Sequence, residues 1–452
     1  MCGVFGVHLH PHAAQVAAIG LHALQHRGQE SAGLAVSSGP VLRVHRAMGS
    51  VAEVLDEATL SGLPGRVAIG QVRYSTTGSS LLKNAQPLCV ESPRGTLAMV
   101  HNGNLTNALP LRRELQDQGA VFTSSTDTEV ALHLLARETE GTLAERTLRT
   151  VERLEGAFSL LVLQGDELVA ARDPHGYRPL VLGKRSQPNG NVWMVASESA
   201  ALSLCGAQLE REVEPGEVVA LGVNGPVSLW MLRRPSRKAC VFEHVYFARP
   251  DSRVFGQTVL EVRKRLGMQL AVEQPVPGAE VVVPVPDSGV SAALGYAEQA
   301  GLPYEFGLIH SQVVGRSFIQ PTIALRESGV RRKLVPVADV IAGRSLVVVD
   351  DSLVRGTTSR QIIGLLRAAG AREVHLRIAA PPTAWPCYYG IDTPDRGQLI
   401  ASRMNPSQMA EFFSCDSVAY LSEPGLLTAA NGQPGGWCTA CFSGDYPEPM
   451  RR

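Results

Sequence analysis

Residues 346–359, with the sequence LVVVDDSLVRGTTS, decide the fold of the second half of the chain. The first four residues are apolar and mostly β-branched, which is typical of a strand buried on both faces of a parallel sheet. Two carboxylates follow at Asp350 and Asp351, then a loop rich in Gly, Thr and Ser, and then a helical pattern over residues 362–369. Another apolar run at residues 374–379 completes a predicted strand–loop–helix–strand unit.

The loop in this unit is a candidate binding site, because open α/β sheets bind ligands at the carboxyl ends of their strands. Backbone N–H groups, hydroxyls and the positive end of a helix dipole suit a phosphate. An ordinary capped loop would explain residues 355–359 alone. The adjacent carboxylates of Asp350 and Asp351, however, repel each other and need a cation or hydroxyl groups. Together, these features predict Mg²⁺ and a diol beside a phosphate cradle.

The rest of the second half repeats the strand–loop–helix order. A predicted buried strand at residues 281–286 ends near Ser288, and a helical pattern follows over residues 292–301. This rhythm indicates an α/β domain with a parallel sheet and helices on its faces. The basic run at residues 331–333, between the first two units, is either a solvated loop or a contact for an anion.

Length and composition limit the possible classes of protein. The chain has 452 residues, of which 44% are hydrophobic and 19% charged, so two or more domains with large cores are expected. Lys and Arg together number 42, as do Asp and Glu, which argues against a nucleic acid or an anionic membrane as partner. No apolar run reaches transmembrane length and the N-terminus is unlike a signal peptide, so a cytoplasmic protein is expected, and its eight cysteines are read as thiols.

Cys2 directly follows the initiator methionine. If Met1 is removed, Cys2 carries a thiol nucleophile together with an α-amino group that titrates near neutrality and can act as its base. An incidental cysteine at a frayed terminus is the alternative. The apolar residues 3–7 favour the nucleophile, because they predict a strand that ties this terminus into a sheet. Retention of Met1 would remove the α-amino base and speak against the hypothesis.

Polar clusters follow Cys2 at the ends of predicted strands and helices, at residues 26–33, 70–76, 101–104 and 124–129. Each alone is ordinary turn or cap chemistry, and Asp127 is a candidate helix N-cap. In this order after an N-terminal Cys, the clusters resemble the glutaminase domain of class II, N-terminal-nucleophile (Ntn) amidotransferases. The resemblance continues at residues 173–180 and 196–199. It implies an α+β domain, a layered αββα sandwich, over residues 1–234.

This resemblance implies a role for each matched residue. The Cys2 thiol attacks the side-chain amide of glutamine, and the Asn102 side chain and the Gly103 N–H stabilise the resulting oxyanion. Arg73 pairs with the α-carboxylate of glutamine, and Asp127 receives its α-ammonium group. The further glutamine-binding residues implied are Arg27, Gly28 and Thr76.

Residues 346–359 resemble the phosphoribosyl diphosphate (PRPP) site of type I phosphoribosyltransferases. The resemblance implies that Ser288, Asp350 and Asp351 hold one Mg²⁺ per subunit. It also implies that residues 313–333 form a mobile loop that closes over PRPP, with Lys333 among the contacts. The PRPP-binding residues implied in the loop and strand end are Asp350, Asp351, Ser352, Arg355, Gly356, Thr357, Thr358 and Ser359.

The two halves in this order resemble the amidophosphoribosyltransferase family, as do residues 247–252 and 326–334. The resemblance implies that ammonia from glutamine passes through the protein to PRPP, giving 5-phosphoribosylamine, glutamate and pyrophosphate in the first committed step of de novo purine (IMP) synthesis. It also implies a homotetramer inhibited by purine nucleotides, with no nucleic-acid or membrane partner. The phosphoribosyltransferase domain is expected at residues 235–452, after a charged linker.

The C-terminal CxxC motif is ambiguous by itself, because it suits zinc, an iron–sulfur cluster or a redox pair. One branch of the amidophosphoribosyltransferase family carries a [4Fe–4S] cluster on four cysteines in the arrangement found here. Tetrahedral zinc would fit the same thiols. Three other cysteines, Cys89, Cys205 and Cys415, have no partner pattern and are expected to be structural. The cluster ligands implied are Cys240, Cys387, Cys438 and Cys441.

Two other hypotheses make different predictions. A regulatory protein that uses a phosphoribosyltransferase fold as a sensor would lack the nucleophile or carry a nucleic-acid-binding segment. Cys2 is present, and no basic helix–turn–helix segment is found. Another class II amidotransferase, making an amino sugar or asparagine, would carry a sugar-isomerase or ATP-site sequence in its second half. Residues 346–359 argue against that possibility.

Overall fold

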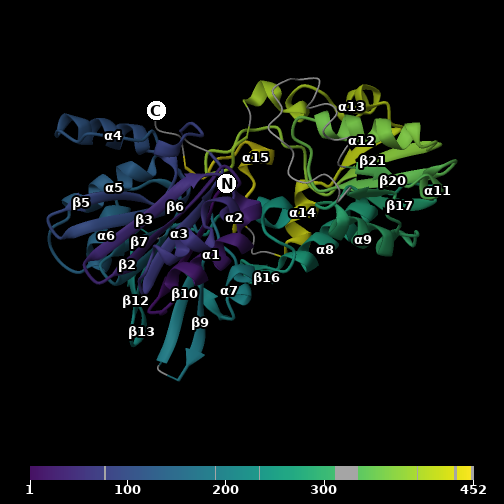
Figure 1. Cartoon of the computed structure of the whole chain (residues 1–452). Helices are drawn as coiled ribbons and strands as arrows, with labels where there is room; N and C mark the ends of the chain where they lie inside the picture. Colours follow the sequence, from purple (N-terminus) through teal and green to yellow (C-terminus); the bar gives the residue numbers. More distant parts are fainter. Residues whose placement is uncertain are drawn as a thin grey trace.

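The computed structural model describes residues 1–75, 78–188, 190–233, 235–310, 334–393, 395–431 and 435–448. Figure 1 shows two lobes, one formed by the first half of the chain and one by the second. The N-terminus and the C-terminal helix α15 (Ala440–Ser443) both lie where the lobes meet. Within these described residues, no helix has the length and apolar character needed to cross a membrane.

The first half contains two antiparallel sheets. The seven-stranded sheet has the order β11-β9-β10-β1-β4-β2-β3 and the six-stranded sheet the order β13-β12-β8-β7-β6-β5. The first comprises β1 (Gly3–His8), β2 (Ser31–Ser38), β3 (Val41–Met48), β4 (Val67–Arg73), β9 (Val181–Gln187), β10 (Gly190–Ala196) and β11 (Gln208–Glu212). The second comprises β5 (Leu88–Ser92), β6 (Gly95–Leu105), β7 (Gly156–Gln164), β8 (Glu167–Arg172), β12 (Glu217–Gly222) and β13 (Gly225–Trp230).

The two sheets pack face to face and helices cover their outer faces. Val4 and Ile69 of the first sheet meet Val100 and Leu161 of the second in one buried cluster. Because side chains alternate along a strand, the other face of each sheet is also apolar and must be covered. The covering helices are α1 (Ala13–Ala23), α2 (Val51–Val54) and α7 (Ser199–Leu204) on the first sheet, and α4 (Ala108–Asp117), α5 (Thr128–Arg137) and α6 (Leu143–Val151) on the second. The predicted αββα sandwich is confirmed.

The second half is built on a four-stranded parallel sheet in the order β17-β20-β21-β22. Its strands are β17 (Val281–Pro284), β20 (Ser345–Asp350), β21 (Glu373–Ile378) and β22 (Ser417–Tyr420). The helices around it include α8 (Val259–Glu273), α9 (Val290–Ala300), α12 (Thr357–Ala368), α13 (Pro406–Phe413) and α14 (Glu423–Ala429). The predicted α/β fold is confirmed.

Strand β20 is buried on both faces, as its sequence predicts. Val347 and Val349 belong to the cluster that includes α8 and α9, whereas Leu346 and Val348 belong to the cluster that includes α12 and α13. All four side chains are fully buried. Asp350 is the last residue of this strand and Asp351 follows it. The strand therefore places both carboxylates in the middle of the carboxyl edge of the sheet.

One predicted boundary differs in the first half. The sequence predicts a strand over residues 97–100 that ends before the polar run at residues 101–104. The structure instead continues β6 through this run to Leu105, with Gly103 opposite Phe158 of β7. The polar run stays in the strand because β7 supplies partners along its whole length, which local sequence does not reveal.

The C-terminal segment contacts both halves. Residues of β23 (Trp437–Cys438) pair in parallel with β14 (Ala239–Cys240). Further along, the carboxylate of Glu448 accepts hydrogen bonds from the Gly156 N–H and the His175 ring, and it pairs with Arg233. The end of the chain therefore contacts Arg233, the first residue of the charged segment that is predicted to link the two halves.

Candidate functional site

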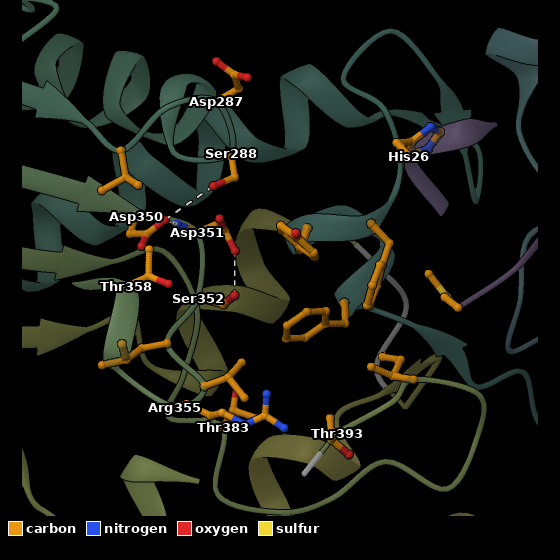
Figure 2. Close-up of a pocket in the computed structure, with 18 of the residues that line it drawn as sticks. His26, Asp287, Ser288, Asp350, Asp351, Ser352, Arg355, Thr358, Thr383 and Thr393 are labelled. Atoms are coloured by element: carbon orange, nitrogen blue, oxygen red, sulfur yellow. Dashed lines mark hydrogen bonds between the residues drawn. The ribbon is translucent and has the colours of Figure 1, made fainter. Parts of the chain in front are cut away.

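A cavity of about 880 Å³ lies at the carboxyl edge of the parallel sheet, where the two halves meet. Strand β20 delivers Asp350 to its wall, and the following loop lines it continuously from Asp351 to Ser359. Figure 2 shows Ser288, Asp350, Asp351 and Ser352 together on one side of this space and His26 on the other. The sequence prediction that the strand end and the polar loop share one site is consistent with this placement.

The carboxylate pair is buried and closely hydrogen-bonded. The Asp351 N–H donates to Asp350 Oδ1 at 2.9 Å, and the Ser288 hydroxyl lies 3.5 Å from the same oxygen. The Ser352 hydroxyl donates to Asp351. Burial and the neighbouring Asp351 carboxylate raise the pKa of Asp350 well above its usual value, and burial also raises the pKa of Asp351. The pair therefore lacks enough positive charge around it, which a divalent cation would supply.

The loop after the pair turns sharply at Gly356 into the N-terminus of α12. Gly356 has a φ of +79°, and a Cβ atom there would lie 2.8 Å from Ile400 and 2.9 Å from Phe413. Glycine is needed because other residues rarely adopt this φ and would collide with both side chains. The turn leaves the first N–H groups of α12 beside the cavity, which suits a phosphate group.

Several residues that sequence reasoning did not assign also line the cavity. Arg249 and Arg263 come from the second half, and Arg263 favours the ionised form of Asp351. Met1, His26 and Tyr74 come from the first half. Sequence reasoning gave these residues no role, because they come from separate elements that only the packing of the two halves brings together.

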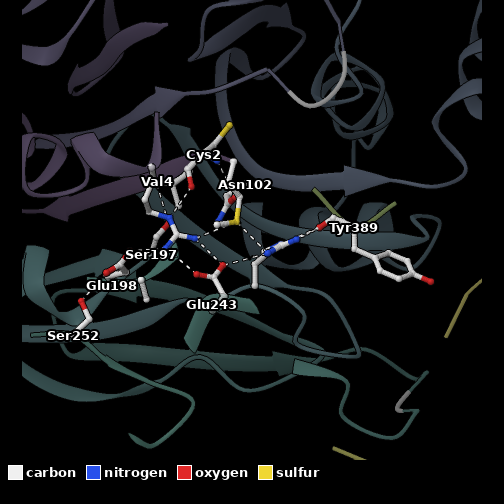
Figure 3. Close-up of polar contacts among 12 residues, drawn as sticks. Cys2, Val4, Asn102, Ser197, Glu198, Glu243, Ser252 and Tyr389 are labelled. Atoms are coloured by element: carbon white, nitrogen blue, oxygen red, sulfur yellow. Dashed lines mark hydrogen bonds and ion pairs between the residues drawn. The ribbon is translucent and has the colours of Figure 1, made fainter. Parts of the chain in front are cut away.

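Cys2 directly precedes β1 and is buried, with 7% of its surface exposed. Its thiol points toward the Tyr74 carbonyl oxygen, with 3.6 Å between sulfur and oxygen. Its main-chain N–H donates to Asn102 Oδ1 at 3.3 Å, and its carbonyl oxygen accepts from Arg27 Nε at 2.9 Å. Figure 3 shows Cys2 beside Asn102. The main chain of the predicted nucleophile is thus held on both sides.

Asn102 is fully buried on β6, directly beside Cys2. Its Oδ1 accepts from the Cys2 N–H, whereas its Nδ2 has no hydrogen-bond partner among the described residues. A buried amide N–H₂ without a partner costs free energy, and it is available to donate to a ligand. The arrangement provides a donor for an oxyanion formed next to the Cys2 thiol.

Arg27 lies at the centre of a buried group of charges, at the wall of the 880 Å³ cavity. Its guanidinium contacts Glu198 at 2.5 Å and Glu243 at 2.8 Å, and Arg178 contacts Glu243 at 3.3 Å. All four side chains are completely buried. Burial would lower the pKa of Arg27, but the two carboxylates outweigh it and raise the pKa. Arg27 Nε donates to the Cys2 carbonyl oxygen, so this group of charges fixes the main chain of Cys2. Figure 3 shows Cys2 near Glu198 and Glu243.

The other predicted glutamine contacts have well-defined surroundings. The Arg73 side chain is buried, donates to Ser75 and lies 3.9 Å from Glu30. Gly28 packs against it, since a Cβ atom at residue 28 would lie 2.5 Å from the Arg73 carbonyl carbon. Asp127 precedes α5 but makes no capping hydrogen bond; it accepts from the Leu105 N–H at 2.9 Å. The alternative prediction, that Asp127 serves only as a helix N-cap, is therefore wrong.

The carboxyl group of Asp127 has a pKa below its usual value although it is buried. Burial would raise the pKa of its carboxyl group, but the nearby His101 ring and hydrogen bonds from the main chain outweigh this effect and lower the pKa. The His101 Nδ1 lies 3.5 Å from the Asp127 carboxylate. A negative charge is thus available near the end of β6. Two predicted contacts, Thr76 and Lys333, lie outside the described residues.

The four predicted ligand cysteines converge where the C-terminal segment meets the second half. Cys240 and Cys438 are opposite each other on β14 and β23. Burial raises the pKa of Cys441 well above its usual value, and the thiols of Cys240, Cys387 and Cys438 are close enough to raise it further. All four thiols are free of disulfides. Among the described residues, no group of three or more His, Cys, Asp or Glu side chains is placed so that it could hold a metal ion.

Comparisons with known proteins agree over the whole chain. Residues 72–204 match the family model of a glutamine amidotransferase domain. The chain is 49% identical to amidophosphoribosyltransferase 2, chloroplastic, of Arabidopsis thaliana, over 99% of this chain and 79% of that protein. It is 46% identical to the amidophosphoribosyltransferase of Bacillus subtilis, over 99% and 94% of the two chains. The solved glutamine PRPP amidotransferase of B. subtilis, complexed with ADP and GMP, is similar with a TM-score of 0.92 and 45% identity, covering 100% of this chain and 98% of that one.

Proposed function

Because the chain belongs to the amidophosphoribosyltransferase family, we propose that its two halves each carry one part of a glutamine-dependent transfer of nitrogen to PRPP. The enzyme forms 5-phosphoribosylamine, glutamate and pyrophosphate from these substrates, in purine biosynthesis. In this proposal, residues 1–234 release ammonia from glutamine and residues 235–452 join it to carbon 1 of PRPP. The buried Nδ2 of Asn102, without a partner among the described residues and next to Cys2, carries the glutaminase assignment.

The glutaminase step starts at Cys2 after removal of Met1. The freed α-amino group takes the thiol proton, and Asn102 Oδ1, which accepts from this nitrogen at 3.3 Å, orients it. The thiolate attacks the glutamine amide carbon, and Asn102 Nδ2 and the Gly103 N–H stabilise the oxyanion. Ammonia leaves with the proton returned by the α-amine, and water hydrolyses the thioester to glutamate. Arg73, Asp127 and the Gly28 and Thr76 loops bind the ends of glutamine, and Arg27 holds Cys2 in place.

The second step takes place in the cavity at the sheet edge. The hydroxyls and N–H groups of residues 352–359 bind the 5-phosphate of PRPP, and Asp350 and Asp351 hold the ribose hydroxyls. Arg249 and Arg263 line the cavity and, together with Lys333, supply positive charge around the diphosphate. Ammonia reaches this cavity from inside the protein, because Tyr74, whose carbonyl oxygen lies 3.6 Å from the Cys2 sulfur, also lines it.

A coupled assay tests this division of labour. With glutamine and PRPP, the purified enzyme is expected to release glutamate and pyrophosphate in equal amounts, and N-terminal mass analysis should show Cys2 as the first residue. Ammonia in place of glutamine should also yield pyrophosphate, without glutamate. Glutamate release without any PRPP-dependent pyrophosphate would contradict the proposal, as would active enzyme that retains Met1.

Two cofactors fit residues of this chain. The buried Asp350 and Asp351 carboxylates and the Ser288 hydroxyl fit one Mg²⁺ per subunit, since hard divalent cations prefer oxygen ligands. Mg²⁺ held there would supply positive charge to the departing diphosphate. Four free, converging thiols fit a [4Fe–4S] cluster, whose usual ligands are four cysteines. A cluster there would connect the start of the second half, the segment after β21 and the C-terminal segment. Its ligands would be Cys240, Cys387, Cys438 and Cys441.

Metal analysis distinguishes the cluster from zinc. Protein purified without oxygen is expected to be brown and to contain about four iron atoms per chain, as a four-iron cluster requires. Cys387→Ser should lower the iron content, whereas Cys415→Ala, which alters a half-buried thiol outside the group, should not. If the protein contains about one zinc per chain and has no visible absorption, the four cysteines hold a tetrahedral zinc ion and not a cluster.

Assembly and regulation complete the proposal. The relative from B. subtilis was solved as a complex with ADP and GMP, which supports purine nucleotides as inhibitors of this enzyme. Exposed apolar side chains on the second half, Leu260, Leu294, Phe306 and Ile309, support association of subunits into a homotetramer. The site of action is the cytoplasm.

A further inference from the structure

The oxyanion donors of the first half lie against a short segment of the second half. We call residues 388–390, which follow Cys387 and comprise Tyr388, Tyr389 and Gly390, the strap. The strap is more than 280 residues away from Asn104 in sequence, yet Asn104 Nδ2 donates to the Tyr388 carbonyl oxygen at 2.8 Å. Strand β6, which carries Asn102 and Gly103, therefore ends in direct contact with the strap.

Two further contacts fix the strap to the glutaminase half. Arg178 donates to the Tyr389 carbonyl oxygen through Nε at 2.9 Å and through Nη2 at 2.6 Å, and Figure 3 shows Tyr389 at the end of this set of polar contacts. The Tyr389 ring stacks on the Tyr177 ring with 4.3 Å between centroids and 11° between planes. The carbonyl oxygens of Tyr388 and Tyr389 and the Tyr389 ring are thus all held by the first half. The strap therefore has little freedom to move.

The closest approach is between two glycines, Gly390 and Gly103. A Cβ atom on residue 390 would lie 2.8 Å from the Gly103 carbonyl carbon and 2.9 Å from its Cα. On its other side, Gly103 faces β7 just as closely, since a Cβ atom on residue 103 would lie 2.0 Å from the Ala157 carbonyl oxygen. The main chain of Gly103 is thus enclosed between β7 and the strap without room for a methyl group.

We infer that the strap positions the oxyanion hole, so that Gly390 of the second half is a positioning residue for glutamine hydrolysis in the first. The inference rests on the proposed roles of Asn102 and Gly103. Donors to a transition state act only within a few tenths of an ångström of their correct position. The strap holds the donor-bearing main chain from the one side that β7 does not reach.

The first test is Gly390→Ala in the full-length enzyme. The added methyl group must displace the Gly103 peptide or the strap, so kcat for glutamine hydrolysis is expected to fall about 10²-fold, the usual cost of losing one oxyanion donor. KM for glutamine should change less than threefold, because Arg73 and Asp127 bind the ends of the substrate. Pyrophosphate formation from PRPP with ammonia should stay within twofold of wild type, which also shows that the variant is folded.

Alkylation of Cys2 separates positioning of the donors from damage to the nucleophile. Iodoacetamide reacts with a thiolate by displacement of iodide and forms no oxyanion, so its rate at Cys2, followed by mass spectrometry of the N-terminal peptide, should be unchanged in Gly390→Ala. Asn104→Ala is a second variant that removes the hydrogen bond to Tyr388 without adding bulk. It should lower kcat for glutamine hydrolysis in the same direction, by about tenfold, the equivalent of one hydrogen bond to a polar partner.

Gly278→Ala is the matched control, since Gly278 also has a positive φ, +82° against +102° for Gly390, and a Cβ atom there meets nothing within 4 Å; its activities should equal wild type. Wild-type kcat for glutamine hydrolysis in both Gly390→Ala and Asn104→Ala would overturn the inference. Parallel loss of alkylation rate or of ammonia-dependent activity would overturn it too, because the strap would then only support the fold. If wild-type enzyme itself releases no glutamate, the proposed function fails instead, so the two failures are distinguishable.

Discussion

Cys2→Ala is expected to abolish glutamine-dependent formation of pyrophosphate while the reaction with ammonia continues. Removal of a catalytic nucleophile costs on the order of 10⁴-fold or more in rate, because the remaining site binds substrate but cannot form the covalent intermediate. The second half keeps its cavity intact in this variant, since the Cys2 side chain is absent from the cavity wall. Glutamate release and PRPP-dependent pyrophosphate release, measured separately with each nitrogen source, give the result.

The control for this experiment is Cys89→Ala. Cys89 is an exposed thiol in β5 of the same half, and its loss should leave both reactions unchanged. Glutamine-dependent turnover that survives in Cys2→Ala would remove Cys2 from the role of nucleophile. Loss of the ammonia reaction as well would show that residue 2 supports the second site directly, contrary to the proposal.

Asp350→Asn is expected to produce the second large effect, a loss of about 10³-fold in pyrophosphate formation with either glutamine or ammonia. The estimate corresponds to loss of a group that holds charge at the reacting centre. Asn keeps the shape of the side chain and can still accept from the Asp351 N–H and the Ser288 hydroxyl, so the fold should survive. Initial rates with ammonia and saturating PRPP and Mg²⁺ provide the measurement.

Two comparisons make this result interpretable. Asp339→Asn changes an exposed acid in the same half, outside the cavity, and should retain wild-type rates. Without Mg²⁺, the melting temperature of Asp350→Asn should be no lower than that of wild type, because one of two adjacent buried carboxylates has been neutralised. Normal ammonia-dependent activity in Asp350→Asn would place the PRPP site elsewhere.

The sequence predicted those parts of the site that depend on one continuous stretch. Residues 346–359 include a strand, its carboxylates and the loop, and these neighbours stay together when the chain folds. Cys2 was predicted for the same reason, because its position and the strand after it are local features. The family resemblance extended this to Asn102 and Gly103, which the structure places beside Cys2 and within β6.

Contacts between distant segments could not be predicted in this way. Arg27 is a predicted glutamine contact, and the structure adds ion pairs of its guanidinium with Glu198 and Glu243, which lie 171 and 216 residues away. The approach of Gly390 to Gly103 likewise has no local pattern, since the chain has 44 glycines and nothing in the sequence marks these two as a pair. Such contacts arise when two folded halves meet, and a single sequence carries no record of that pairing.

The buried charges around Arg27 limit how this enzyme can be recombined with others. The first half contributes Arg27, Arg178 and Glu198, leaving one positive charge uncompensated, and the second half contributes Glu243, which balances it. A chimera whose second half lacked an acid at this position would bury an unpaired guanidinium, at a cost of about 3–5 kcal/mol. Whole halves can therefore be exchanged between related enzymes only when the incoming second half also has an acid at the position of Glu243. The two halves must change together at these positions during evolution.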